Sequence, residues 1–129
     1  MVRIINQTQI SRKKTVGEKV IYVEISPFEE YERLQIAGAL NLPPDKVRER
    51  APRYLPNRAA EIVIYGVTEN SPEAWAAARE LDAMGYGNIY FYPGGKNEWV
   101  KMGYDVESVH YPPPPPNVGL GPDRDVKAA

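Results

Sequence analysis

The chain has 129 residues, of which 43% are hydrophobic and 26% charged, and its formal net charge is −1. This length is typical of a single globular domain with a core of its own. A net charge so near zero supplies no field that would gather nucleic acid or an anionic membrane surface, so we expect neither as a partner.

The residue types that the chain lacks narrow its chemistry further. It contains no cysteine, which excludes disulfides, thiolate catalysis and Cys-ligated metals. Its one histidine, His110, argues against a catalytic triad or a His-based metal site, so we expect neither a metal nor a cofactor. No apolar run approaches the ~20 residues of a membrane span and no signal peptide is recognisable, which predicts cytoplasmic residence.

The first predicted strand is Lys19–Ile25, which is rich in β-branched residues. It stops at Ser26 and Pro27, which together with Glu29 fit the N-cap, N1 and N3 positions of a capping box. A short helix over Phe28–Leu34 is therefore expected to follow.

The middle of the chain continues this alternation. Ala39–Leu42 is a short second strand, and Asp45–Arg53 is a basic surface helix that Pro52 should cut. Ile62–Tyr65 is a short apolar run bounded by charge and glycine, which predicts a buried third strand.

The clearest helix is Pro72–Met84, in which small and apolar residues repeat at helical spacing. Ser71 suits its N-cap and Gly85 its C-terminal stop. Asn88–Tyr92 is a fourth strand, and Lys96–Met102 is a last short helix.

These elements predict an α/β fold with a mostly parallel central sheet of about five strands, flanked by helices on both faces. Residues 1–18 should form an N-terminal segment packed on the domain, and residues 19–110 the domain itself. Residues 111–129 should form a proline-rich extended tail, because Pro112–Pro116 favour polyproline II. A stiff tail laid over the domain or left in solvent is the favoured interpretation. The alternatives are a ligand for a proline-recognising groove and an arm exchanged in a dimer.

Several segments, in this order, resemble the motifs of rhodanese (sulfurtransferase) domains. Glu29–Tyr31 followed by Gln35–Pro43 is similar to the family's Glu-Tyr…His-Ile-Pro-Gly-Ala-Ile-Asn-Ile-Pro signature. Gly85–Tyr90, Pro93–Trp99 and Gly103–Glu107 resemble its three closing motifs. The resemblance covers about residues 19–107 and implies a single rhodanese-like domain.

The same resemblance implies that the family's chemistry is missing. Rhodaneses pass a sulfane sulfur through a cysteine persulfide, and that cysteine directly follows the third strand. The matching residue here is Gly66. The hydroxyls of Thr68 and Ser71 cannot carry a persulfide, and no base is at hand to activate them as nucleophiles.

Other departures from the family pattern agree. The loop carries Glu69 and no basic residue, so it should repel an anionic sulfur donor. The family's Asp-x-Arg after the first strand is replaced by Glu24–Ser26, and its Gly-His by Leu34 and Gln35. From Gly66 to Gly85 the loop and helix are about two residues longer than in the simplest relatives.

We therefore expect a rhodanese homologue without sulfurtransferase activity that acts as a binding or regulatory module. Its contact surface should be the vestigial loop after the third strand, where a protein partner or a small ligand would bind. This loop comprises Gly66, Val67, Thr68, Glu69, Asn70 and Ser71. Two alternatives stay open: an enzyme of different chemistry that uses hydroxyl or carboxylate groups of this loop, and a purely structural protomer of a homodimer.

If the tail is peripheral, truncation after Tyr111 should leave a folded domain. We expect the melting temperature to change by no more than a few degrees, which corresponds to about 1 kcal/mol or less, as measured by circular dichroism. A collapse in expression, or a change from dimer to monomer, would make the tail an integral part of the fold.

Overall fold

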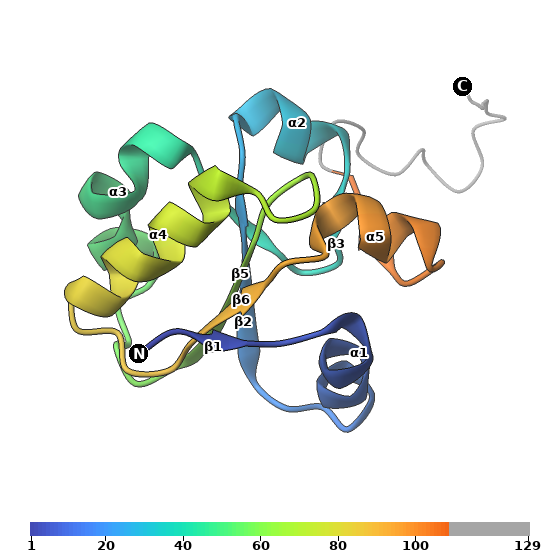
Figure 1. Cartoon of the computed structure of the whole chain (residues 1–129), viewed down its shortest axis with the longest axis horizontal. Helices are drawn as coiled ribbons and strands as arrows, with labels where there is room; N and C mark the ends of the chain where they lie inside the picture. The colour runs from blue at the N-terminus through green and yellow to red at the C-terminus, as the bar shows by residue number, and fades with distance from the viewer. Residues whose placement is uncertain (109–129) are drawn as a thin grey trace, which may run out of the picture.

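The computed structural model describes residues 1–108 (Figure 1). The predictions for His110 and for the tail, residues 111–129, lie outside the described residues.

Five parallel strands form the central sheet, in the order β1-β6-β5-β2-β4. In chain order these strands are β1 (Arg3–Ile4), β2 (Val20–Ile25), β4 (Leu40–Leu42), β5 (Glu61–Tyr65) and β6 (Ile89–Tyr92). A separate antiparallel pair joins β3 (Gln35–Ile36) to β7 (Val106–Glu107). The predicted α/β fold with a mostly parallel sheet is confirmed.

Helices cover both faces of the sheet (Figure 1). The helices α3 (Val47–Tyr54) and α4 (Pro72–Ala83) pack on one face, while α1 (Gln7–Thr15) and α5 (Gly95–Lys101) pack on the other. Two shorter elements complete the described chain: helix α2 (Phe28–Arg33) and the 3₁₀ helix η1 (Pro44–Lys46).

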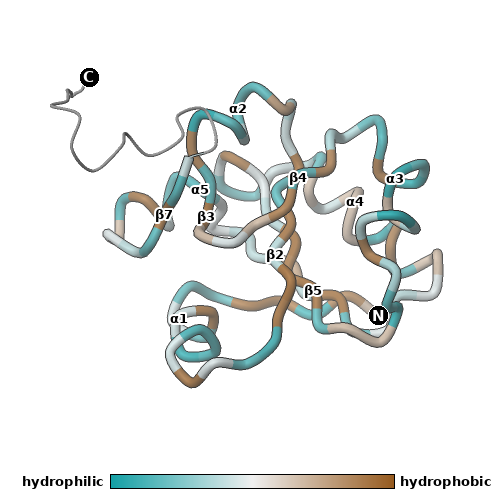
Figure 2. Tube along the Cα trace, turned by 180° about the vertical axis from the view of Figure 1, so that it is seen from behind, coloured by the Kyte–Doolittle hydropathy of each residue, from teal (hydrophilic) through white to brown (hydrophobic). Residues whose placement is uncertain are grey.

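The central strands supply side chains to both halves of the core because successive residues point to opposite faces. In β5, Ile62 and Ile64 lie in the cluster under α3 and α4, whereas Val63 and Tyr65 lie in the cluster under α1 and α5. Figure 2 shows the outcome as hydrophobic strands at the centre of the fold. No helix among residues 1–108 is long and apolar enough to cross a membrane.

The predicted capping box at Ser26 is wrong. Pro27 is the N-cap of α2, and no side chain caps this helix. The Ser26 hydroxyl instead donates to the buried carboxylate of Glu24 at 2.6 Å. Leaving a buried carboxylate short of hydrogen-bond donors costs more free energy than leaving the end of a short exposed helix uncapped. The Ser26 hydroxyl therefore bonds to Glu24 and does not cap α2.

The predicted break at Pro52 is also wrong, since α3 continues through it to Tyr54. The Leu55 amide closes the last turn on the Ala51 carbonyl at 2.7 Å. Val47, Ala51 and Leu55 are buried in the core, and this burial outweighs the hydrogen bond that a proline cannot donate.

Residues 1–18 contribute two regular elements that the sequence analysis did not identify. Strand β1 pairs with β6 at one edge of the sheet, and α1 buries Ile10. Asn6 caps this helix, with Gln9 completing a capping box.

Candidate functional site

The loop 66–71 lies at the C-terminal end of β5 and leads directly into α4. Ser71 accepts a hydrogen bond from the Ala74 amide at 3.2 Å, which confirms its prediction as the N-cap of this helix. The Asn70 amide donates to the Pro93 carbonyl at 2.7 Å, so the loop is tied to the chain that follows β6. Asn70 adopts a positive φ of 55°, a conformation that asparagine tolerates better than most residues.

The start of α5 braces the same loop through backbone hydrogen bonds. The Lys96 amide donates to the Gly66 carbonyl at 2.8 Å, and the Asn97 amide donates to the Val67 carbonyl at 2.9 Å. A Cβ atom on Gly95 would lie 2.6 Å from the Thr68 carbonyl, so only glycine allows this approach. Two first-turn N–H groups of α5 are therefore used by the loop itself rather than directed at a ligand.

Gly66, which the motif resemblance matches to the nucleophile of rhodaneses, has no room for a side chain. It is buried, and a Cβ atom built on it would lie 2.4 Å from the Ser71 Cβ and 2.5 Å from the Ser71 Oγ. A third close neighbour is the Ala74 Cβ, at 3.3 Å. The space that a reactive side chain would need is filled by the helix cap.

Two hollows flank the loop. The first, of about 230 Å³, lies between the loop and the chain after β2 and is lined by Ile25, Ser26, Pro27, Pro44, Val67, Thr68, Ser71 and Glu73. The second, of about 390 Å³, lies on the α5 side and is lined by Glu69, Gly94, Asn97, Glu98, Lys101 and Met102. Three of the lining side chains carry carboxylates, and one, Lys101, carries a positive charge.

The loop hydroxyls are poorly placed for nucleophilic chemistry. The Ser71 Oγ is occupied as the helix cap and also donates to the Glu73 carboxylate at 3.3 Å. Thr68 is exposed, and its hydroxyl has no hydrogen-bond partner among residues 1–108. His110, the one imidazole of the chain, lies outside the described residues.

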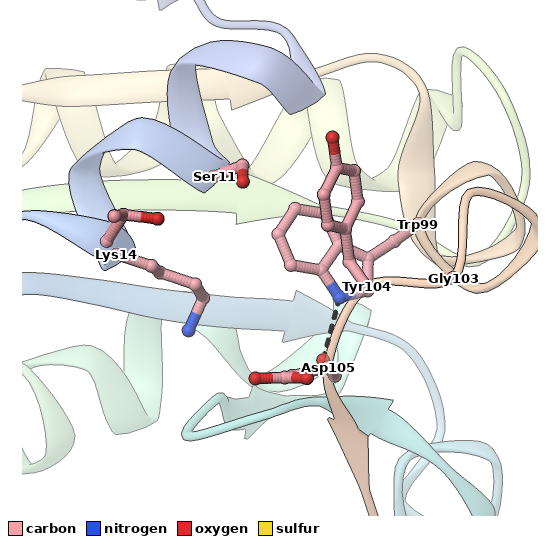
Figure 3. A pocket seen from close by; sticks show the side chains of 7 residues that line it. Ser11, Lys14, Trp99, Gly103, Tyr104 and Asp105 are labelled. Carbon is pink, nitrogen blue, oxygen red and sulfur yellow. Dashed lines mark hydrogen bonds between the residues drawn. The ribbon is translucent and has the colours of Figure 1, made fainter.

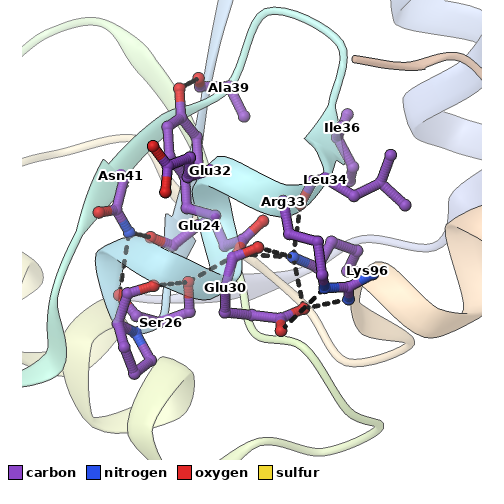
Figure 4. A network of polar contacts seen from close by, with 12 residues as sticks. Glu24, Ser26, Glu30, Glu32, Arg33, Leu34, Ile36, Ala39, Asn41 and Lys96 are labelled. Atoms are coloured by element: carbon purple, nitrogen blue, oxygen red, sulfur yellow. Dashed lines mark hydrogen bonds and ion pairs between the residues drawn. The ribbon is translucent and has the colours of Figure 1, made fainter. Parts of the chain in front are cut away.

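A buried ion pair lies beneath this site (Figure 4). The side chains of Lys96 and Glu24 are 1% and 0% exposed, and the Lys96 Nζ lies 2.9 Å from the Glu24 Oε2. The same ammonium donates to the Leu34 carbonyl at 2.6 Å and to the Glu30 carbonyl at 3.1 Å. It also pairs with the Glu30 carboxylate at 2.9 Å, so its charge is compensated on two sides.

The Glu24 carboxylate has two further donors. Ser26 donates to its Oε2 at 2.6 Å, and the Tyr65 hydroxyl donates to its Oε1 at 3.0 Å. Burial, followed by the charge of Glu24, raises the pKa of Tyr65, so this phenol keeps its proton and acts as a donor. The Tyr65 hydroxyl in turn accepts from the Ile36 amide at 3.2 Å. The network therefore joins β2, β5, β3 and α5.

The sequence analysis identified Glu24 only as part of the segment that replaces the family's Asp-x-Arg motif. It did not predict that Lys96 pairs with this carboxylate. A carboxylate within an apolar strand is a usable signal, because a buried charge requires a partner. The sequence alone does not say which of its 16 Lys and Arg residues supplies that partner.

A separate hollow lies away from the loop, between α1 and the chain after α5 (Figure 3). It measures about 250 Å³ and is lined by Ser11, Lys14, Thr15, Trp99, Gly103, Tyr104 and Asp105. Lys14 donates to the Ala37 carbonyl at 2.9 Å, and burial lowers the pKa of its ammonium group. None of the predicted site residues lies here.

Comparison with known families agrees with this architecture. The family model of the Rhodanese-like domain matches residues 8–102. The chain therefore belongs to the rhodanese-like family, and it lacks the cysteine through which that family transfers sulfur. No curated protein sequence matches the chain significantly.

Solved structures show the same fold. The Alr3790 protein from Anabaena sp. is 20% identical over 81% of this chain and 80% of that chain, with a TM-score of 0.74. The BH2092 protein from Bacillus halodurans is 23% identical over 84% and 78%, with a TM-score of 0.75. A thiosulfate sulfurtransferase from Pseudomonas aeruginosa is 18% identical over 82% of this chain but only 20% of that chain, with a TM-score of 0.72. At these identities the likeness shows the fold alone.

The buried pair should be essential for stability. Lys96→Met leaves the Glu24 carboxylate buried without its main cation, so we expect the free energy of unfolding to fall by about 3–5 kcal/mol in urea titrations. Adding Glu24→Leu should recover part of this loss. Arg48 and Glu80 form a more exposed pair at 2.8 Å, and Arg48→Met should cost about 1 kcal/mol or less. A Lys96→Met protein as stable as the wild type would contradict this assignment.

The crowding around Gly66 predicts how a thiol introduced there would react with an alkylating agent. Gly66→Cys creates the only thiol in the chain, and it should alkylate with iodoacetamide no faster than an unperturbed thiol, because Ser71 obstructs it and Glu69 disfavours the thiolate. Adding Glu69→Lys should accelerate the reaction.

Gly87→Cys is the matched control, since Gly87 is exposed and a Cβ there meets nothing within 4 Å. If Gly66→Cys alkylates many-fold faster than Gly87→Cys, the loop is an intact cradle that lost only its nucleophile.

Proposed function

We propose that this chain is a rhodanese-like domain without sulfurtransferase activity that works as a binding or regulatory module. Its contact surface is the loop 66–71, and its ligand there is a protein partner or a small molecule. Two observations carry the proposal: the chain has no cysteine, and Ser71 fills the space beside Gly66, the residue that the motif resemblance matches to the family nucleophile.

The chemistry of sulfur transfer supports this conclusion. A persulfide forms when a thiolate attacks a sulfane sulfur, creating a sulfur–sulfur bond and releasing the rest of the donor. A hydroxyl cannot make that bond, and the Ser71 hydroxyl, which contacts the Glu73 carboxylate, is held in place as the cap of α4. The α5 amides that face the loop are already bonded to its carbonyls, so they do not stabilise an anion there.

The charges around the loop restrict the ligand further. Glu69 and Glu73 are exposed, and the Glu98 carboxylate lines the same hollow as Glu69. These carboxylates disfavour an anion such as thiosulfate and favour a neutral or cationic group. A protein segment that carries Lys or Arg could pair with these carboxylates and place side chains in the two hollows.

The alternatives receive less support. An enzyme of different chemistry would need a free hydroxyl hydrogen-bonded to a base. The Ser71 hydroxyl is used as a helix cap, and the Thr68 hydroxyl has no hydrogen-bond partner among residues 1–108. A purely structural homodimer protomer stays a prediction, as does cytoplasmic residence.

The first test of the proposal is turnover. Purified protein should produce no thiocyanate from thiosulfate and cyanide above a heat-treated sample, and mass spectrometry should detect no sulfur adduct. Thiocyanate production that follows the protein through purification would contradict the loss of activity.

The second test addresses binding. A photoreactive amino acid at Thr68 should cross-link a defined partner in cell extract, whereas the same group at the exposed Arg12 on α1 should not. Glu69→Lys together with Glu73→Lys should abolish the cross-link, because they reverse the charge of the loop. Cross-linking that does not depend on these residues would sink the assignment of this surface.

A further inference from the structure

A groove lined by aromatic rings lies on a different part of the surface. It measures about 220 Å³ and is lined by Phe28, Tyr31, Leu40, Asn41, Arg50 and Tyr54. Phe28 and Tyr31 are three residues apart on α2, and Arg50 and Tyr54 are four apart on α3, so each pair shares one helix face. Between the two helices lies β4, one of the two edge strands of the sheet (Figure 2). We refer to this feature as the aromatic groove.

The rings of the aromatic groove are only partly covered. Phe28 is 50% exposed and Tyr54 is 46% exposed. Phe28 contacts Tyr31, with ring centroids 6.1 Å apart, while Tyr54 has no ring partner among residues 1–108. Two large exposed rings across a hollow favour an apolar, flat-sided ligand.

The groove also offers hydrogen-bond donors without partners. The Arg50 guanidinium and the Tyr54 hydroxyl make no hydrogen bond or ion pair with any described residue. Two other polar groups are already engaged: Tyr31 donates to the Ala39 carbonyl at 2.6 Å, and the Asn41 amide donates to the Glu24 and Ser26 carbonyls at 3.1 and 3.0 Å. The ligand should therefore present hydrogen-bond acceptors, such as carbonyl oxygens, to Arg50 and Tyr54.

A run of prolines has this chemistry. Proline lacks an N–H group, its ring is flat-sided and apolar, and in polyproline II its carbonyls stay unbonded. Grooves that recognise such runs pair aromatic rings with a few donors. This chain carries five consecutive prolines, Pro112–Pro116.

The described chain ends beside α2, the helix that supplies Phe28 and Tyr31 to the groove. The Ser108 hydroxyl donates to the Glu32 carbonyl of α2 at 3.0 Å. Glu32 is four residues beyond Phe28, about 6 Å along the helix axis. Residues 109–111 separate Ser108 from Pro112 and can span about 10 Å. The proline run can thus reach the aromatic groove of its own chain.

We propose that the aromatic groove binds Pro112–Pro116 of the same chain as a polyproline II segment. The rings of Phe28 and Tyr54 contact the proline rings, and Arg50 and the Tyr54 hydroxyl donate to the proline carbonyls. A strand added to β4 is the wrong mode of binding, because proline has no N–H to donate to a sheet edge.

The test uses the full chain and nuclear magnetic resonance. The wild type should show nuclear Overhauser contacts between the ring protons of Tyr54 and the Hδ protons of the proline run. In a full-length variant with Pro112→Gly, Pro113→Ser, Pro114→Gly, Pro115→Ser and Pro116→Gly, these contacts should vanish and the Phe28 and Tyr54 ring resonances should shift. Ile4, at the other edge of the sheet, should not shift. Unchanged Phe28 and Tyr54 resonances would overturn the proposal.

Variants of the groove supply a second measurement. An acetylated and amidated Tyr-Pro-Pro-Pro-Pro-Pro-Asn peptide, with the sequence of residues 111–117, should bind saturably to the variant in which Pro112–Pro116 are replaced. Tyr54→Ala should weaken this binding at least about tenfold, and Arg50→Gln should weaken it as well. Ile4→Ala, at a residue that is 60% exposed, and Arg12→Gln should leave it unchanged. Equal binding by all four variants would refute the aromatic groove as the site.

Light scattering distinguishes the source of the proline run. The wild type should be a monomer at concentrations where the nuclear Overhauser contacts are present. A dimer that dissociates when the prolines are replaced would show that a second copy donates the run, which would overturn binding within one chain.

Discussion

The structure depends on one requirement: the Glu24 carboxylate and the Lys96 ammonium are both removed from water and must compensate each other. The carboxylate comes from a central strand and the ammonium from the first turn of α5, so their pairing fixes that helix against the sheet. Lys96 also donates to the Leu34 carbonyl, which holds the chain that leaves α2. Removing either partner leaves a buried charge, which is why this contact outweighs any single surface ion pair.

The same residue links the core to the loop 66–71. While the Lys96 side chain pairs with Glu24, its backbone amide donates to the Gly66 carbonyl. The loop is therefore held by the frame of the domain, and Ser71 packs into the space beside Gly66. A nucleophilic side chain at Gly66 would have to displace the cap of α4. The absence of cysteine and the shape of the loop therefore both support the proposal that the domain does not transfer sulfur.

The two proposed surfaces differ in chemistry, which separates their ligands. Around the loop, Glu69, Glu73 and Glu98 favour a neutral or cationic group. In the aromatic groove, Arg50 and Tyr54 are donors that favour carbonyl oxygens. Under these two proposals, one domain binds a partner at its loop while the groove binds a segment of the same chain.

The sequence by itself determined the alternation of strands and helices, the cap at Ser71 and the absence of a cysteine nucleophile. These features follow from local periodicity, from neighbours within a few residues or from residue identity, so no knowledge of distant contacts is needed. The failures at Ser26 and Pro52 have the opposite origin. In both places a local preference lost to a contact with the core or with a buried charge.

Only the tertiary structure decided the rest. Glu24 and Lys96 are 72 residues apart in sequence, and the sequence does not show which Lys or Arg pairs with that carboxylate. The filled space at Gly66 and the donors of the aromatic groove likewise depend on where side chains from different elements meet. Such meetings follow from the packing of the whole chain, because a buried charge or an occupied volume is defined by its surroundings and not by the residues beside it in sequence.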